Sequence, residues 1–258
     1  MRLQLLLGLP LEVWAGAILG SVVIPAIWLA LRSSYDWWSR SRPRRRVFQQ
    51  LAADSEPCVI FMRDFVLAPG SAILAVEPRV GVGKVPNVSQ LWADVDARAL
   101  SYVLNALGQA GKRKNIRIVR MSEDTGIWNA NIVVIGGQSQ KSFDFYARLR
   151  NVSYRMDGQN IIDSQTGRPI PRDNDYGYGI ILKARNPHST HGGDGVGLLV
   201  GGFGTLGTAA AGYYLAQHVE DIGRQFGRKC FGIVVRTSVT AGEEAVERLP
   251  QYDRASQN

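Results

Sequence analysis

The chain has 258 residues, of which 45% are hydrophobic and 20% are charged, and its formal net charge is +8. This composition is ordinary for a folded protein and excludes a chain that is disordered throughout. The positive charge does not indicate nucleic-acid binding, because arginines within residues 1–46 account for most of the excess and the rest is nearly balanced. We therefore expect no nucleic-acid partner.

Residues 11–31 form a continuous apolar segment whose only charge is Glu12. As a helix, this segment would span about 30 Å, the thickness of the hydrocarbon core of a bilayer. The arginines from Arg40 to Arg46 follow the segment, which is the reverse of a cleavable signal peptide. The sequence therefore predicts an N-terminal anchor over residues 1–46, with one transmembrane helix at 11–31. Since positive charge stays inside, we expect a single-pass protein of a bacterial-type inner (plasma) membrane, with its N-terminus outside and its domain in the cytoplasm. The bilayer is then a partner through 11–31, and anionic lipid head groups are partners at Arg40–Arg46.

Residues 47–240 alternate between apolar strand patterns and helical spacing, after a short linking helix at 47–56. Strands are predicted at 58–65, 71–76, 116–121, 131–135, 179–184, 196–200 and 230–236, and helices at 88–111, 140–150 and 206–225, with an irregular loop at 78–87. Turn signals at Asp157-Gly158 and Thr166-Gly167 predict a β-hairpin insertion over 154–172. Fully apolar strands between helices predict an α/β domain with a mostly parallel, Rossmann-like sheet and helices on both faces. Residues 241–258 are expected to form a loosely ordered tail.

Two of the predicted strands pass into helices through glycine-rich loops. Gly136-Gly137-Gln138-Ser139 follows strand 131–135, and Gly201-Gly202-Phe203-Gly204-Thr205 follows strand 196–200. Glycine lets a ligand approach the backbone closely, and a helix N-terminus offers unpaired N–H groups to an anion. Ligands of open α/β sheets bind beyond the carboxyl ends of the strands. The alternative is that these glycines serve only the close packing of helices on strands. The candidate ligand- and phosphate-binding residues are Gly136, Gly137, Gln138, Ser139, Gly201, Gly202, Gly204, Thr205, Thr208 and Asn186.

The second loop resembles the GGxGT phosphate loop of the LOG-like, or SLOG, Rossmann-type superfamily. The resemblance is carried by Gly201-Gly202-Phe203-Gly204-Thr205 and covers about 25 residues with the flanking strand and helix. That superfamily contains nucleotide-monophosphate phosphoribohydrolases and nucleotide-sensing domains of bacterial conflict systems. Its hydrolases continue the motif to a glutamate, GGxGTxxE, and Thr208 stands at that position here. The resemblance therefore implies a nucleotide-binding or sensing role rather than hydrolysis.

Other polar residues give weaker signals for catalysis or metal binding. Asp175 and Glu123 are the candidates for a catalytic carboxylate, although both also fit ordinary turns. His188 and His191 lie three residues apart, but with only Asp194 nearby they favour an exposed loop over a metal site. We expect no metal, and the only cofactor or small-molecule partner indicated is a nucleotide-type ligand.

Three functional hypotheses remain open from the sequence. The first is a membrane-anchored sensor or effector module that binds a nucleotide or nucleotide-derived signal. The second is a membrane-tethered enzyme, a hydrolase or transferase acting on a nucleotide or ribosyl substrate. The third is a non-catalytic membrane scaffold. Assembly into a homo-oligomer is compatible with each of them.

Overall fold

The computed structural model describes most of the chain, and its described residues are 22–62, 64–66, 90–92, 94–120, 128–158, 160–190, 195–203 and 206–255, without the side chains of 36–38, 40, 64–66 and 90–92. Two compact units divide the chain, residues 1–42 and residues 43–258. The predicted strand at 71–76 and the loop at 78–87 lie outside the described residues.

In the first unit, the described residues from Ile24 onward belong to helix α2 (Ile24–Phe48). Its apolar side chains there are exposed, with Ile24 at 60%, Trp28 at 56% and Leu31 at 64%. Within the part of the chain that the structure describes, no helix combines the length and apolar character needed to cross a bilayer. The predicted span at 11–31 therefore gains no support from these helices, and residues 11–21 of it lie outside the described residues.

An eight-stranded sheet forms the centre of the second unit, in the order β11-β10-β8-β9-β5-β1-β4, with β12 also paired to β10. The strands are β1 (Cys58–Met62), β4 (Ile116–Arg120), β5 (Asn131–Ile135), β8 (Tyr176–Asn186), β9 (Gly195–Gly202), β10 (Phe231–Ser238), β11 (Glu247–Arg248) and β12 (Arg254–Ala255). The pairs β1–β4, β1–β5 and β5–β9 are parallel, whereas β8 is antiparallel to both β9 and β10. The fold is thus α/β, with a mixed central sheet that is parallel across β4, β1, β5 and β9 and antiparallel across β9, β8, β10 and β11.

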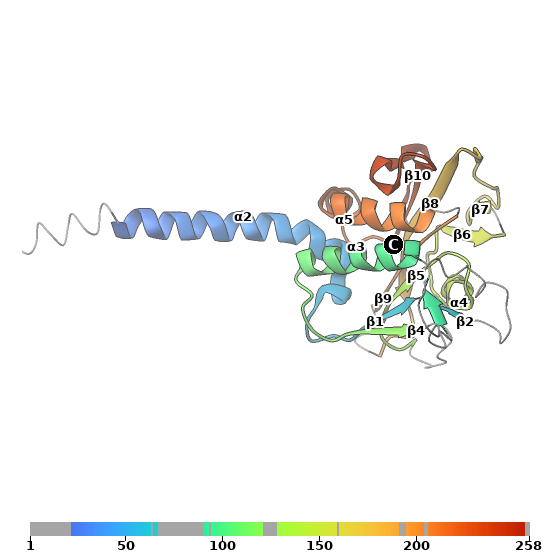
Figure 1. Ribbon diagram of the computed structural model, residues 1–258. Coiled ribbons are helices and arrows are strands. Elements are labelled where there is room, and N and C mark those ends of the chain that lie inside the picture. The colour runs from blue at the N-terminus through green and yellow to red at the C-terminus, as the bar shows by residue number, and fades with distance from the viewer. Residues whose placement is uncertain are drawn as a thin grey trace, which may run out of the picture. The chain divides into compact units, whose positions relative to one another are not determined.

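Helices and a hairpin cover the two faces of this sheet, as Figure 1 shows with the sheet seen nearly edge-on. Helices α3 (Asp94–Ala110) and α5 (Gly207–Phe226) pack on one face, together with the last turn of α2 and the 3-10 helix η2 (Gln49–Ala52). Helix α4 (Gln140–Arg148) and the hairpin of β6 (Tyr154–Asp157) and β7 (Asn160–Asp163) pack on the other. Side chains of a strand alternate between faces, so two separate apolar cores result. A small sheet of β2 (Asp64–Val66) and β3 (Gln90–Trp92) lies outside the main one.

Several boundaries differ from those that the sequence predicts. The helix expected at 88–111 begins only at Asp94, after β3, and it ends before Gly111. The hairpin expected at 154–172 is present as β6 and β7. Strand β8 is antiparallel because only residues 187–194 connect it to β9, and a parallel connection needs a crossover of a dozen residues or more.

The expectation of a loosely ordered tail from residue 241 is wrong for its described part, residues 241–255. This segment contains two short 3-10 helices, η4 (Glu243–Ala245) and η5 (Pro250–Tyr252), and the strands β11 and β12. Both strands pair with β10 and so extend the edge of the sheet. Strands of two residues have no hydrophobic period, so the sequence alone does not reveal them.

Candidate functional site

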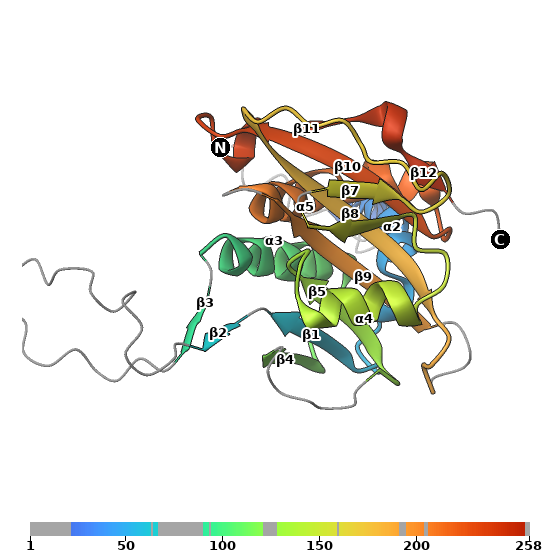
Figure 2. The same cartoon turned by 90° about the vertical axis from the view of Figure 1, so that its right-hand side faces the viewer.

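The two glycine loops lie side by side at the carboxyl edge of the sheet. Strands β5 and β9 are parallel neighbours, with Ile135 paired to Val200. The backbone N–H of Gly136 donates to the carbonyl oxygen of Val200 at 2.9 Å, which continues the pairing into the first loop. Helix α4 begins directly after the first loop and α5 directly after the second (Figure 2). Two helix N-termini therefore follow adjacent strand ends.

The first loop is held from the side of α4 through its carbonyl groups. Gly136 has a φ of +103°, and its carbonyl oxygen accepts a hydrogen bond from the Ser142 hydroxyl at 2.6 Å. The carbonyl oxygen of Gly137 accepts from the Tyr146 hydroxyl at 3.2 Å, and burial raises the pKa of that tyrosine. The described peptide bonds are trans, so the C=O and N–H groups of each point in opposite directions. The N–H groups of Gly137 and Gln138 therefore point away from these two hydroxyls.

Ser139 starts helix α4 as its N-cap residue. Its hydroxyl oxygen accepts from the backbone N–H of Ser142 at 3.1 Å, which satisfies one of the first amides of the helix. Gln138, just before it, is exposed. Ser139 therefore has a structural role, and Gln138 is the residue of this loop whose side chain is open to solvent.

The second loop packs closely against its neighbours, which explains most of its glycines. A Cβ at Gly201 would lie 2.7 Å from the Cα of Gly137, and one at Gly202 would lie 2.2 Å from the carbonyl carbon of Gly207. Both distances are too short for a real side chain, so the two loops and the start of α5 meet backbone to backbone. Thr208 is only 4% exposed in the first turn of α5. Close packing thus accounts for Gly201 and Gly202 without a ligand.

The hairpin insertion reaches both glycine loops with side chains that the sequence did not mark as site residues. The sulfur of Met156 covers Gly137, where a Cβ would lie 1.8 Å from it. The guanidinium carbon of Arg172 lies 5.2 Å from the ring centroid of Phe203, a residue of the second loop. Arg172 thus places a positive charge beside this loop. Only the tertiary fold shows this, because Arg172 is about 30 residues from the loop in sequence.

A second cation lies beside the first loop. Lys141 is in the first turn of α4 and is 6% exposed, with its ammonium nitrogen 5.4 Å from the ring centroid of Phe61. A sequence signal for it exists, since it follows a glycine-rich loop at the start of a helix, as phosphate-binding lysines do. Each glycine loop therefore has one cationic side chain close to it.

Asp175 lies at the same sheet edge as the glycine loops. Because β8 is antiparallel to β9, its first residues lie beside the last residues of β9, and Gly179 pairs with Gly202. Asp175 comes just before β8 and is exposed, and its backbone N–H donates to Oδ1 of Asp173 at 3.0 Å. Its carboxylate therefore faces solvent near the predicted site.

Asn186 lies at the opposite edge of the sheet, so it does not belong to this site. It is the last residue of β8 and is fully buried. Its Nδ2 donates to the carbonyl oxygens of Trp128 and Ala130 at 2.9 and 2.8 Å, and its Oδ1 accepts from the N–H of His188 at 3.1 Å. The amide therefore fixes the chain before β5, and its expected role in ligand binding is wrong. The reversed direction of β8 is the reason.

The other predicted residues, Gly204, Thr205 and Glu123, lie outside the described residues, as do His191 and Asp194. Among the described residues, no group of three histidine, cysteine or acidic side chains is placed to hold a metal ion. A scan against protein-family models finds no match for the chain, and no curated protein matches it.

Proposed function

We propose that the carboxyl edge of the sheet, at loops 136–139 and 201–205, binds an anionic ligand of the nucleotide type, and that the protein is a membrane-attached sensor or effector module. One observation carries this proposal: parallel pairing of β5 and β9 brings two helix N-termini and two cationic side chains, Lys141 and Arg172, to one sheet edge.

Each part of this arrangement favours negative charge. A helix N-terminus carries roughly half a positive charge, and its first amides have no partner within the helix. The N–H groups of Gly137 and Gln138 point away from α4, because the carbonyls of the same peptides are bonded on the α4 side. Since close packing explains Gly201 and Gly202, the ligand contacts are expected at Gln138, at the first turns of α4 and α5, and at Arg172.

A nucleotide is the anion that the resemblance to the LOG-like superfamily favours, through its Rossmann-like GGxGT loop. Thr208 takes the place of the glutamate that the hydrolases of that superfamily have, and it is buried. Binding without hydrolysis is therefore the form of the proposal that fits this chain.

Attachment to a membrane is the second part of the proposal. The described end of the apolar segment, Val22–Leu31, exposes apolar side chains that water does not favour, among them Ile27 at 54% and Leu29 at 60%. We propose a span at 11–31 with the domain on the cytoplasmic side. Not every arginine of Arg40–Arg46 faces lipid, since Arg44 pairs with Glu220 at 3.5 Å and Arg45 donates to the carbonyl oxygen of Ala110 at 3.2 Å.

An enzyme acting on the same class of ligand is a second candidate, favoured by the exposed carboxylate of Asp175 at the same edge. Asp175→Asn would then abolish turnover of a nucleotide or ribosyl substrate and leave the unfolding midpoint unchanged. Turnover by this variant at the wild-type rate would remove the residue from any such mechanism.

Calorimetric titration of the full-length chain in detergent with nucleoside mono-, di- and triphosphates, cyclic nucleotides and inorganic phosphate tests the binding proposal. Gln138→Glu adds a negative charge beside the anion at nearly constant shape, and a like charge at about 6 Å weakens affinity by about tenfold or more. Gln217→Glu makes the same change at an exposed position in the middle of α5 and should bind as the wild type does. The proposal fails if no compound binds, or if both variants bind with wild-type affinity.

A further inference from the structure

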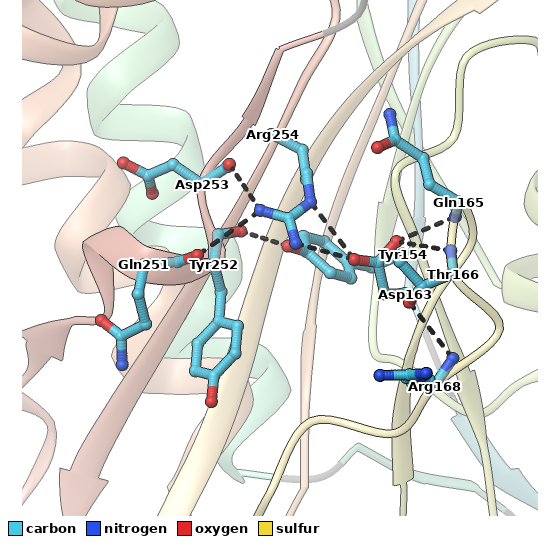
Figure 3. A network of polar contacts seen from close by, with 9 residues as sticks. All are labelled: Tyr154, Asp163, Gln165, Thr166, Arg168, Gln251, Tyr252, Asp253 and Arg254. Carbon is cyan, nitrogen blue, oxygen red and sulfur yellow. Dashed lines mark hydrogen bonds and ion pairs between the residues drawn. The ribbon is translucent and has the colours of Figure 1, made fainter.

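The hairpin of β6 and β7 is joined to residues 250–255 by an ion pair (Figure 3). Oδ2 of Asp163, at the end of β7, accepts from Nε and Nη2 of Arg254 at 3.2 and 2.8 Å. Oδ1 of the same carboxylate accepts from the backbone N–H of Gln165 at 2.8 Å, and Asp163 is only 5% exposed. A carboxylate with donors on both oxygens and little access to water has one preferred geometry. The end of the hairpin is therefore fixed to Arg254.

A second contact joins the first strand of the hairpin to the same segment. The hydroxyl of Tyr154 donates to the carbonyl oxygen of Tyr252, and the side chain of Tyr154 is fully buried. Nη1 of Arg254 donates to the carbonyl oxygens of Gln251 and Asp253, which holds the guanidinium in place (Figure 3). Both strands of the hairpin thus contact the segment Pro250–Ala255, which we call the strap.

The strap is itself attached to the sheet and to helix α5. Strand β12 pairs with β10, with Arg254 opposite Gly232. Arg248, just before the strap, forms an ion pair with Asp253 and donates to Oε1 of Gln225 in α5 at 2.6 Å. The strap therefore connects the hairpin to β10 and, through Arg248, to α5.

On its other side, the hairpin insertion contacts the glycine loops. Met156 of β6 covers Gly137, and Arg172, at the end of the insertion, lies over the ring of Phe203. A continuous set of contacts thus runs from β10 and α5 through the strap and the hairpin to both loops.

We infer that the strap is a regulatory latch: it holds the hairpin against the two glycine loops, and its release loosens these loops and displaces Met156 and Arg172 from them. The contacts of the strap stand independently of any ligand, whereas its effect on ligand affinity rests on the proposed function. What the latch regulates is the binding of the anionic ligand that the proposed function assigns to these loops.

Hydrogen exchange followed by mass spectrometry, with the full-length chain, tests the latch without a ligand. Arg254→Met removes the ion pair but keeps the length of the side chain. Amides of 154–163 and of loop 136–139 should then exchange about tenfold faster, while those of α3 keep the wild-type rate. Arg224→Met is the matched control, since it breaks exposed ion pairs to Glu220 and Asp221 on α5 and should change neither region.

Three outcomes would overturn the latch: wild-type exchange in both regions, faster exchange in the hairpin alone, or equal acceleration throughout the domain including α3. Arg254→Lys, which keeps the charge but not the paired donors, should give an intermediate rate. Titration with whichever nucleotide binds the wild type best should show affinity reduced about tenfold in Arg254→Met. If no nucleotide binds but the loops still exchange faster, the latch stands and the proposed function fails. If a nucleotide binds and Arg254→Met changes neither exchange nor affinity, the latch fails and the proposed function stands.

Discussion

Lys183 is a buried cation whose titration should be measurable in the stability of the protein. It lies in β8 and is 1% exposed, and its Nζ donates to the backbone carbonyl oxygens of Arg46 and Arg228 at 2.9 and 3.2 Å. Burial lowers the pKa of its ammonium group from the ordinary 10.5 to about 8. A neutral amine still has two N–H groups, so both carbonyls keep a donor after the proton is lost. Lys183→Met removes the titration and approximately preserves the volume.

The direction of the effect follows from proton binding in the two states. Between pH 8 and 10.5 the unfolded chain binds this proton and the folded chain does not, so the free energy of unfolding rises with pH. Each unit of pKa difference corresponds to about 1.4 kcal/mol, and the full difference is therefore about 3 kcal/mol. Between pH 7 and 10 the expected gain is about 2.5 kcal/mol.

Chemical denaturation of the wild type and of Lys183→Met, at intervals from pH 7 to 10, measures this gain. Tyrosines, the other lysines and Cys58 also titrate in this range, but they are common to both proteins and cancel in the difference. Cys230 interacts with Lys183, so its titration belongs to the measured difference. The free energy of unfolding of the wild type minus that of the variant should rise by about 2.5 kcal/mol over the interval. Two parallel profiles would show that burial does not disfavour the charge of Lys183, and the reasoning would be refuted.

Two further predictions concern stability. Burial raises the pKa of the Asp163 carboxyl, but backbone N–H donors and the Arg254 guanidinium together lower it below its ordinary 3.8. The stabilisation that the ionised carboxylate gives the folded state is therefore present above pH 3.8 and is lost as the pH falls through the lowered pKa. Asp163→Asn should therefore lower the free energy of unfolding by about 1–3 kcal/mol at pH 7 and flatten its decline in acid, as urea titrations would show; an unchanged acid profile would contradict this. Gly223→Ala should destabilise by about 1–3 kcal/mol in thermal unfolding, because its Cβ would lie 2.0 Å from the carbonyl oxygen of Pro43. Gly108→Ala, within α3, is the control, because a Cβ at this position would meet no atom within 4 Å. This substitution should be neutral or stabilise the fold by up to about 1 kcal/mol. Equal effects of the two substitutions would contradict the role of close packing at Gly223.

Elements with a strong local signal were predictable from the sequence. The β-branched run at 131–135 is β5 with the expected bounds, and the turn signal at Asp157-Gly158 marks the end of β6 and the start of its connection to β7. The helix predicted at 206–225 is α5, shifted by a single residue at each end. In each case the hydrophobic period and the turn residues lie within the element itself, so neighbours in sequence are sufficient to define it.

The candidate site was predictable only where it depends on such elements. Both glycine loops follow buried strands, and the structure places them at adjacent strand ends, as an open parallel sheet requires. Arg172 was missed because it reaches Phe203 through the fold of the insertion, and Asn186 was misplaced because the direction of β8 was not known.

What the sequence by itself determined is the set of strongly apolar strands, the helices around them and the two strand-to-helix loops, since these depend on side-chain periodicity and on glycine. The tertiary structure alone decided the reversed direction of β8, the pairing of β11 and β12 with β10, and the burial of Lys183 against two backbone carbonyls. A run of apolar residues packs equally well in a parallel or an antiparallel pair, and a lysine is the same residue in water or in a core. These features are set by contacts between residues distant in sequence, which form only when the whole sheet assembles.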